Sequence, residues 1–316
     1  MNDYEKLNTL VQIAKLYYLH NMGQQAIADK LKISRSYVSK LLIEARELGV
    51  VEVKIRDVVD TESAIEASLR EKFKLKKAIV VPVEVNEFDK KLEAVSIALS
   101  RYLYNIVGDY DIIGVSWGVT LHVCAQKLAK KPLKGVIVTQ LYGGLTHVEK
   151  GVHASEIVTN FARAFGATPY FMPLPAIVDS EEMRDTIIKD RSVANVLDLA
   201  LKSQIAVFSV GGFGMDSSLV RAGYFTEGKV EELQKKGVVG DACARLFNIE
   251  GEIVKNEFEK RTIGVPLDNL RRKKYSILVL ADDNKAKGTY GILKGGYANV
   301  IVTDEITARA VLSLCK

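Results

Sequence analysis

The residues best suited to chemistry follow short apolar runs and are rich in glycine and hydroxyl groups. Ser116, Gly118 and Thr120 lie between the run DIIGV and a helical pattern. A glycine at such a turn lets the backbone approach a ligand, and hydroxyl groups beside a helix N-terminus favour an anion. Phosphate is the expected ligand, although G-x-x-x-G turns also allow close packing of the backbone without any ligand. Trp117, the only tryptophan, could anchor the core or cover a sugar ring.

A second loop of this kind follows the apolar run GVIVTQL. Its polar members are Gln140 and Tyr142, and the paired glycines Gly143 and Gly144 come directly after them. The amide and the phenol could hydrogen-bond to ligand hydroxyl groups, or they could simply complete a strand. All four are therefore candidate ligand residues, with a purely structural role as the alternative.

Two charged residues occupy later loops. Asp241 follows Gly240 at an expected turn, where its carboxylate could receive sugar hydroxyls or cap a helix. Lys285 lies near an expected helix start, where the helix dipole disfavours a cation. An anionic partner would explain that position, and simple solvation of the lysine is the alternative.

Several other chemistries lose support from the sequence. The four histidines are dispersed, and Cys124, Cys243 and Cys315 are odd in number and lack metal-type spacing, which argues against a metal site and favours a reducing compartment. The sequence has no G-x-S-x-G, no P-loop lysine and no G-x-G-x-x-G after a strand, so hydrolase, NTPase and dinucleotide functions are not indicated. No cofactor is expected.

The candidate ligand loops are expected to be positioned by a parallel sheet. Six dense apolar runs alternate with helical patterns: AIVVPV, DIIGVS, GVIVTQL, IAVFSVGG, YSILVLA and NVIVT. Such runs are typical of strands covered on both faces, and their alternation with helices predicts a mostly parallel α/β layer fold. Ligands of open parallel sheets bind beyond the carboxyl ends of the strands, where these loops would lie. Residues 247–254 are expected to form a small hairpin.

A different element is expected between Gly23 and Arg46, where the spacing predicts two helices joined by a tight turn. Ile33 would fill the turn, and Ser34 would cap the second helix. The apolar residues that would join the helices are Ala26, Ile27, Leu31, Val38, Leu41, Leu42 and Ala45. A helix over residues 8–19 would complete the small domain, and alternating apolar residues at 51, 53 and 55 could form one side of a wing.

Polar and basic side chains on this helical pair point to DNA. The candidate DNA-binding residues are Gln24, Gln25, Ser34, Arg35, Ser36, Tyr37, Ser39 and Lys40. In a helix-turn-helix the second helix lies in the major groove with its first residues against base edges, so Arg35 is the expected base contact. Residues 24–46 hold five Lys or Arg against two Asp or Glu, an excess that a solvated helical hairpin could also show.

The whole chain is large enough for a small domain at residues 1–57 and a large one at residues 58–316. An amphipathic helix within residues 58–76 would connect them, either packed on the large domain or solvated as a linker. The net charge of +5 is slight and spread out, which argues against a broad polyelectrolyte binder. A signal peptide and a bilayer-spanning apolar run are both missing from the sequence, so we expect a cytoplasmic protein.

Taken in order, six segments of this chain resemble the SorC family of bacterial sugar-responsive transcriptional regulators, close to its DeoR-like members. They are QQAIADKLKISRSYVSKLL, GVSWGVTL, QLYGG, VGDACARLF, RTIGVPLDNLRR and KGGYANVIVTDEITARAVL. The resemblance implies an N-terminal helix-turn-helix and an effector domain similar in fold to ribose-5-phosphate and glucosamine-6-phosphate isomerases. It also implies a homodimer or homotetramer whose affinity for operator DNA changes when a sugar or sugar phosphate binds.

The resemblance assigns some roles residue by residue. Ser116, Gly118 and Thr120 match the phosphate loop of the family, Asp241 its G-D turn, and Lys285 the lysine of its late segment. Gly23 departs from the pattern, because a serine or threonine often caps the first helix there. Tyr142 stands where similar members can carry a lysine, and a phenol cannot form an imine with an aldehyde.

The leading hypothesis is thus a regulator switched by a sugar or sugar phosphate. A sugar-phosphate isomerase with an appended DNA-binding domain is the alternative, since Asp241 could serve as a base, but no convincing acid partner accompanies it. A DNA-architectural protein is not indicated, given the slight charge and the large α/β domain.

Overall fold

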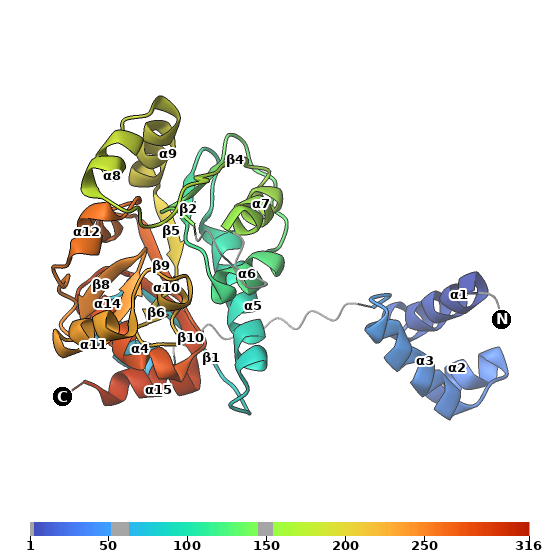
Figure 1. Cartoon of the computed structure of the whole chain (residues 1–316). Helices are drawn as coiled ribbons and strands as arrows, with labels where there is room; N and C mark the ends of the chain where they lie inside the picture. Colours follow the sequence, from blue (N-terminus) through green and yellow to red (C-terminus); the bar gives the residue numbers. More distant parts are fainter. Residues whose placement is uncertain (1–2, 52–62, 145–153, 316) are drawn as a thin grey trace. The chain divides into compact units, whose positions relative to one another are not determined.

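The computed structural model describes residues 3–51, 63–144 and 154–315 (Figure 1). The chain divides into two compact units, residues 1–61 and residues 62–316. In its described part the first unit is helical, whereas the second is an α/β fold built on a seven-stranded sheet.

The first unit is a small helical bundle with a shared apolar core. Its helices are α1 (Asp3–Ala14), which continues as the π-helical turn η1 (Lys15–Leu19), α2 (Gln24–Leu31) and α3 (Arg35–Glu47). The helix expected over residues 8–19 therefore begins earlier in the chain. The core consists of Leu10, Ile13, Leu16, Ile27, Ala28, Val38, Leu41, Leu42 and Ala45. Burial of these side chains supplies the stability that such short helices lack in isolation.

Local geometry confirms most of the predicted helix-turn-helix. Ser34 caps α3, and its hydroxyl accepts a hydrogen bond from the Tyr37 amide at 3.2 Å. Gly49 follows the end of α3 with a φ of +70°, a left-handed conformation that glycine adopts without strain. The prediction for Ala26 was wrong: it is exposed, and Ala28 lies beside Ile27 in the core because the helical period places residues 27, 28 and 31 on one face.

The wing prediction concerns residues that mostly lie outside the described part of the chain. Val51 is described and has no strand conformation, while positions 53 and 55 fall in the undescribed stretch 52–62. The Val51 amide donates a hydrogen bond to the Ala45 carbonyl at 3.0 Å, so the chain still follows the end of α3 at this point.

The second unit contains the predicted parallel sheet. Its strands are β1 (Lys77–Val81), β2 (Ile112–Val115), β3 (Ile137–Gln140), β4 (Thr168–Tyr170), β5 (Ile205–Phe208), β9 (Tyr275–Val279) and β10 (Val300–Asp304). The strand order is β1-β10-β9-β5-β2-β3-β4, and every pairing is parallel. All strands therefore end at the same edge of the sheet, where the candidate loops begin.

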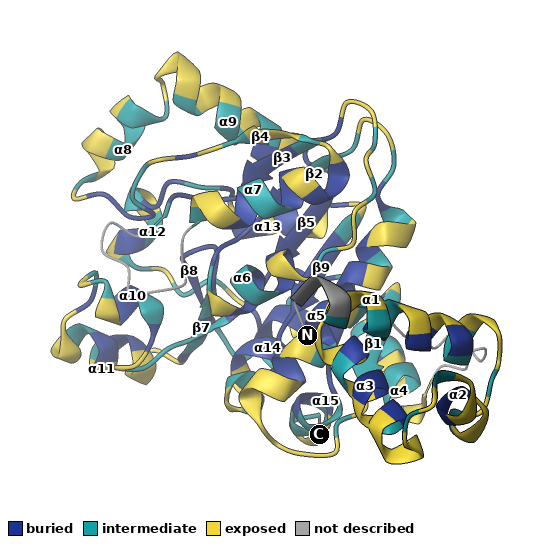
Figure 2. Ribbon diagram, turned by 90° about the vertical axis from the view of Figure 1, so that its right-hand side faces the viewer, coloured by how far each residue is buried: buried dark blue, intermediate teal, exposed yellow. Residues whose placement is uncertain are grey.

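Helices cover both faces of this sheet (Figure 1). One layer contains α5 (Phe88–Ile106), α6 (Val119–Gln126) and α7 (Ala154–Phe165). The other contains α4 (Ala64–Phe73), α9 (Arg191–Lys202), α14 (Ala286–Lys294) and α15 (Glu305–Ser313). Shorter helices are α8 (Glu181–Ile187), α10 (Ser218–Arg221), α11 (Glu227–Lys235), α12 (Glu257–Arg261), α13 (Leu267–Arg271) and the 3-10 turn η2 (Asp283–Lys285). The central strands are consequently buried on both faces (Figure 2).

A small antiparallel sheet, which the apolar runs of the sequence do not predict, accompanies the large one. It consists of β6 (Gly211–Gly212), β7 (Val238–Ala242) and β8 (Arg245–Asn248), in the order β6-β7-β8. Asp241 therefore lies within β7 and not at a turn, and neither does it cap a helix. The turn falls two residues later, at Cys243 and Ala244, which have φ values of +50° and +58°. The hairpin predicted over residues 247–254 is confirmed by the antiparallel bridge between Phe247 and Ile253.

The expected connector helix corresponds to α4, and it is packed rather than solvated. Leu69 is fully buried in the core of the second unit, and α4 contacts β1 and α15. The two Glu66 carboxylate oxygens make separate contacts: one accepts the Ser63 amide at 2.8 Å and the other accepts the Val80 amide of β1 at 2.9 Å. Glu66 thus completes a capping box and fastens the start of α4 to the edge strand.

We expect Glu66→Ala to destabilise the second unit by about 1 to 3 kcal/mol, because the variant leaves two backbone amides without their acceptor. Urea unfolding followed by Trp117 fluorescence measures this, since the only tryptophan lies in that unit. Glu71→Ala, at an exposed position of the same helix, is the matched control. Equal stabilities of the two variants would contradict a fastening role for Glu66.

Candidate functional site

A cavity of about 790 Å³ lies beyond the carboxyl ends of β2, β5 and β9. The loops that follow these three strands contribute to its lining: Trp117 through Thr120 after β2, Ser209 through Gly214 after β5, and Asp282, Asn284 and Lys285 after β9. The small sheet supplies a further wall through β7. This is the location at which open parallel sheets bind their ligands.

Six of the ten predicted ligand residues line this cavity, although they are far apart in the sequence. They are Trp117, Gly118, Thr120, Tyr142, Asp241 and Lys285. The other four, Ser116, Gln140, Gly143 and Gly144, are not among its lining residues. The parallel sheet accounts for the convergence, because it gathers the loops that follow different strands at one edge.

The loop after β3 divides into structural residues and one cavity residue. Gln140 is buried, and its side-chain oxygen accepts the Met172 amide at 2.7 Å. Gly143 lies so close to the Pro175 carbonyl that a side chain would clash, and the Gly144 amide donates to Leu174 at 2.8 Å. These contacts favour the structural role for all three, while Tyr142 lines the cavity.

The loop after β2 leads into the N-terminus of α6. Gly118 is the N-cap residue, with a φ of +136° that a side chain would strain, and no atom fills the space where a β-carbon would lie. The first amides of α6 therefore begin at an open position on the cavity wall. Ser116, two residues before Gly118, is buried, and its hydroxyl has no hydrogen-bond partner among the described residues.

Trp117 and Tyr142 form a fixed aromatic pair on the cavity wall. Their rings stack with centroids 5.0 Å apart, and the Trp117 indole donates to the Gly143 carbonyl at 2.7 Å. Burial raises the pKa of Tyr142 well above its usual value, and nearby Cys243 and Asp241 raise it further. Tyr142 therefore remains a neutral phenol that can donate a hydrogen bond. Trp117 is a buried anchor that also lines the cavity, and its role as a cover over a sugar ring stays a prediction.

Asp241 brings a carboxylate to the cavity. Burial raises its pKa from 3.8 to about 6, while the Ala244 amide and the charge of Lys285 act in the opposite direction. A side chain on Gly211, in the neighbouring strand β6, would overlap the Asp241 carboxylate. The glycine therefore allows the carboxylate to occupy its position, where ligand hydroxyl groups could replace the water that burial removes.

Lys285 lies at the junction of η2 and α14 and lines the cavity with partial exposure. Its ammonium group is 3.6 Å from the Asp282 carboxylate. The adjacent Asp283 forms an ion pair of 2.7 Å with Lys91 of α5, whose side chain is almost fully buried. This ion pair holds η2 against α5 and so fixes the approach of Lys285 to the cavity.

Several lining residues were missed at the sequence level. They include Phe88, Ser209, Asp216, Ser217, Ser218, Arg221, Gln234, Asn284 and Lys287. The available signal was the glycine-rich stretch GGFG directly after an apolar strand, which was not singled out as a ligand loop. The hydroxyl group of Ser209, the first residue after β5, is buried without a partner among the described residues.

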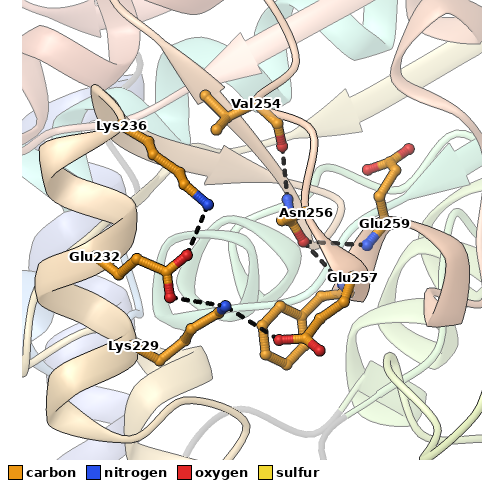
Figure 3. Close-up of polar contacts among 8 residues, drawn as sticks. Lys229, Glu232, Lys236, Val254, Asn256, Glu257 and Glu259 are labelled. Atoms are coloured by element: carbon orange, nitrogen blue, oxygen red, sulfur yellow. Dashed lines mark hydrogen bonds and ion pairs between the residues drawn. The ribbon is translucent and has the colours of Figure 1, made fainter.

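The wall that contains α11 is held to the rest of the unit by an ion-pair network (Figure 3). Lys229 of α11 contacts Glu232 at 2.9 Å and Glu257 of α12 at 3.1 Å, and Lys236 contacts Glu232 at 2.6 Å. Hydrogen bonds from the two lysines lower the pKa of Glu232 to about 2. Asn256 caps α12 by accepting hydrogen bonds from two of its amides. The network orients α11, whose Gln234 lines the cavity.

The predicted DNA-binding residues lie on the first turn of α2, on the first two turns of α3, and at Ser34, the N-cap of α3. Arg35, Ser36, Tyr37 and Lys40 are exposed on α3, and no ion pair of Arg35 or Lys40 occurs within the described residues. In contrast, Gln25 donates to Asp29 at 2.9 Å. Further predicted residues are Gln24 and Ser39, both half-buried, and the exposed cap Ser34. The N-terminal face of α3 is thus a cationic, hydroxyl-bearing surface.

Comparison with known proteins gives a family for this arrangement. Residues 58–313 match the family model "Putative sugar-binding domain". The deoxyribonucleoside regulator of Bacillus subtilis (strain 168) is 38% identical over 311 residues, which cover 98% of this chain and 99% of that protein. The chain belongs to the SorC family of sugar-binding transcriptional regulators.

Two further similarities extend over nearly the whole chain. The sorbitol operon regulator of Klebsiella pneumoniae is 26% identical over 314 residues, 99% of this chain and 100% of that protein. The crystal structure of the full-length sorbitol operon regulator SorC from Klebsiella pneumoniae matches with a TM-score of 0.82 at 28% identity, and covers 96% of this chain and 98% of that one.

These similarities confirm the predicted fold class and the leading functional hypothesis. The chain is a ligand-responsive transcriptional regulator with a sugar-binding domain, and not an isomerase-like enzyme, because the relatives that match it are regulators. Within the described residues, no helix has the length and apolarity needed to cross a membrane, and no cluster of side chains suits a metal ion.

The Asp241 carboxyl group gives the second unit a predictable pH dependence. Its pKa rises from 3.8 to about 6 on folding, so the folded state favours the protonated carboxyl group. The contribution of this group to the free energy of unfolding is therefore fully present below about pH 4 and is lost as the pH rises through 6. Asp241→Asn keeps an acceptor for the Ala244 amide and removes the ionisation. We expect the variant to melt at a higher temperature than the wild type at about pH 8, with a smaller difference near pH 5. Thermal unfolding at both pH values tests this, and a variant less stable at the higher pH would contradict it.

Proposed function

We propose that the chain is a cytoplasmic regulator that binds operator DNA through α3 and responds to a sugar phosphate in the cavity of its second unit. The cytoplasm is the compartment because the operator lies on the chromosome there. The effector would act on a homodimer or homotetramer. Whether the effector raises or lowers the affinity for DNA depends on which arrangement of the oligomer it binds more tightly.

The observation that carries the phosphate assignment is the pairing of a helix N-terminus with cations in one cavity. The open start of α6 at Gly118 supplies backbone amides. Arg221, Lys285 and Lys287 supply positive charge from other elements of the wall. Amides at a helix N-terminus and basic side chains together favour a phosphate group.

The polar remainder of the cavity suits sugar hydroxyl groups. Asp241 accepts hydrogen bonds, the neutral Tyr142 donates them, and Ser209 has an unused buried hydroxyl. Trp117 offers an apolar surface beside them. Because Tyr142 has no amine, we propose that the effector binds without a covalent imine at this position.

The proposed DNA contact uses the exposed start of α3. Arg35 would read a base, while Ser34, Ser36, Tyr37, Ser39 and Lys40, with Gln24 and Gln25 of α2, would hold phosphates or further base edges. An oligomer with two-fold symmetry would place two such helices about 34 Å apart on the operator, or a multiple of that.

A thermal-shift screen tests the effector assignment directly. A ligand that binds only the folded state raises the melting temperature according to its concentration and affinity. The names of the relatives, a deoxyribonucleoside regulator and a sorbitol operon regulator, suggest phosphorylated pentoses and hexitols as the first panel. We expect a shift with at least one sugar phosphate and a smaller shift with the corresponding free sugar. Equal shifts in melting temperature with the sugar phosphate and with the free sugar would contradict a phosphate-binding role for the cavity.

Lys285→Ala should weaken binding of the sugar phosphate at least tenfold, because a charge-assisted contact to phosphate is lost. Operator binding without effector should stay unchanged, since Lys285 lies in the second unit. Calorimetric titration and operator anisotropy measure the two quantities. Lys235→Ala, at an exposed position of α11 outside the cavity lining, is the control. Unchanged effector affinity in Lys285→Ala would exclude this residue from the site.

Arg35→Ala should cost about 1 to 3 kcal/mol of specific operator binding if Arg35 reads a guanine. Binding to a random duplex should change far less, because a base contact contributes only to the specific complex. Anisotropy titrations on both duplexes at one fixed salt concentration give the comparison. An equal loss on both duplexes would reassign Arg35 to a phosphate contact.

A further inference from the structure

Three basic segments of the chain meet at the edge of the large sheet where its strands begin, which is opposite the cavity. Residues 74–77 (KLKK) run into β1, residues 130–134 (KKPLK) precede β3, and residues 271–274 (RRKK) lead into β9. Together they hold ten Lys or Arg and no Asp or Glu. Because every pairing is parallel, all strands begin at this one edge. The fold therefore gathers charge that is dispersed along the sequence.

Two of the three segments are in direct contact. The Lys76 ammonium group donates to the Lys274 carbonyl at 2.7 Å. Both ammonium groups lie near the Tyr275 ring, at 5.5 Å from its centroid for Lys76 and 5.4 Å for Lys274. The side chain of Asn299, at the start of β10, donates to the Lys274 carbonyl at 3.3 Å. The starts of β1, β10 and β9 thus form one continuous positive surface.

Acidic side chains do not neutralise this surface. Asp109 and Asp111, which precede β2, accept backbone amides of Lys134 and Gly108, each at 2.8 Å. Within the described part of the chain, no ion pair involves the exposed cations of this edge, Lys74, Lys76, Lys130, Lys134, Arg272 and Lys274. We call these six residues the basic edge. Like charges held together at a surface repel one another unless an anion lies over them.

Tyr110 adds an exposed phenol to the same edge, in the loop before β2. The residue is 71% exposed and has a φ of +64°, a left-handed conformation that is uncommon for a bulky side chain. Its ring lies against Gly135, where any side chain would clash, and its amide donates to the Lys134 carbonyl at 2.8 Å. Such strain persists only where the surrounding structure imposes it, and it is typical of functional sites. The phenol is thus held in place with its hydroxyl group available to an anion.

The length of this edge suits a segment of duplex DNA. Strands β1 and β3 are five positions apart in the sheet, which corresponds to about 24 Å. This distance equals the rise of about seven base pairs. Lysine, arginine and tyrosine side chains are common donors to phosphate oxygens, and such contacts need no particular base sequence.

We propose that the basic edge binds the phosphates of duplex DNA outside the bases that α3 reads. The second unit then contributes a sequence-independent term to DNA affinity, separate from the effector cavity at the opposite edge of the sheet. The proposal rests on the proposed operator binding in one respect, because DNA held by the first unit is present at a high local concentration for the second. For this reason duplex DNA is a better partner for this edge than an acidic protein.

The test measures how salt weakens binding of the full-length chain to a random-sequence duplex of about 40 base pairs, long enough for contacts beyond those of α3. Fluorescence anisotropy gives the dissociation constant at each salt concentration. We expect Lys74→Gln/Arg272→Gln/Lys274→Gln to raise this constant at least tenfold at low salt. The slope of log affinity against log salt should fall by about 2 to 3, since each lost phosphate contact accounts for about 0.9.

Two control variants separate a local contact from a change in net charge or stability. Lys189→Gln/Lys235→Gln/Lys255→Gln removes the same charge from exposed positions elsewhere in the second unit, and it should keep the wild-type slope. Lys74→Arg/Lys274→Arg preserves the charge of the edge and should do the same. Circular dichroism and melting temperature show whether each variant is folded.

The possible outcomes decide the question. Equal slopes for the wild type and the basic-edge variant would overturn the inference, and so would equal losses in that variant and the Lys189, Lys235 and Lys255 control. Polyglutamate that competes as well as DNA at the same charge concentration would assign the edge to an acidic protein instead. A chain that prefers no operator to the random duplex, yet shows the slope difference, would contradict the proposed function and leave the DNA contact of the basic edge standing.

Discussion

The parallel hydrogen bonding of the large sheet is the constraint on which the candidate effector site depends. Because all seven strands run in the same direction, every strand ends at one edge. The loops after β2, β5 and β9 therefore meet, and they bring Gly118, Ser209 and Lys285 to one cavity although these residues are far apart in the chain. Antiparallel pairing of a single central strand would send one of these loops to the opposite edge.

The periodic features of the sequence predicted the elements well. Buried strands on the parallel sheet are dense apolar runs, and the 3.6-residue period locates α2 and α3, so both could be read without a structure. Ser34 could be predicted as a cap because its hydroxyl acts within one turn of the helix. The Ala26 prediction failed because Ala26 and Ala28 are the same residue type and differ only in the side of α2 on which they lie.

The candidate site was harder to predict because its residues act through long-range packing. The structural roles of Gln140 and Gly143 depend on Met172 and Pro175, some thirty residues away, and no local pattern reveals these contacts. Asp241 was assigned to a turn because the G-D pair is typical of turns, yet strand pairing with β6 and β8 extends the chain there. Arg221 and Lys287 carry no motif, and only the fold brings them to the cavity.

A continuous set of contacts joins the cavity to α4, the first helix of the second unit. Phe88 of α5 lines the cavity, and Lys91 on the same helix holds η2 through Asp283. Helix α5 contacts β1, whose Val80 amide is bound by Glu66 of α4. An effector that repositions α5 or η2 would thus act on α4, the helix that follows the DNA-binding unit in the chain. The size of this effect is limited by the difference in effector affinity between the original and the shifted positions of these elements.

The central claim is that a sugar phosphate in this cavity controls the affinity for operator DNA. The most direct measurement is the anisotropy of labelled operator bound to the full-length chain, titrated with the sugar phosphate that stabilises it and with the corresponding free sugar. The account predicts that the phosphorylated form changes the operator dissociation constant about fivefold or more, in one direction, with a smaller effect of the free sugar. An operator affinity that stays constant while the sugar phosphate saturates the cavity would contradict it.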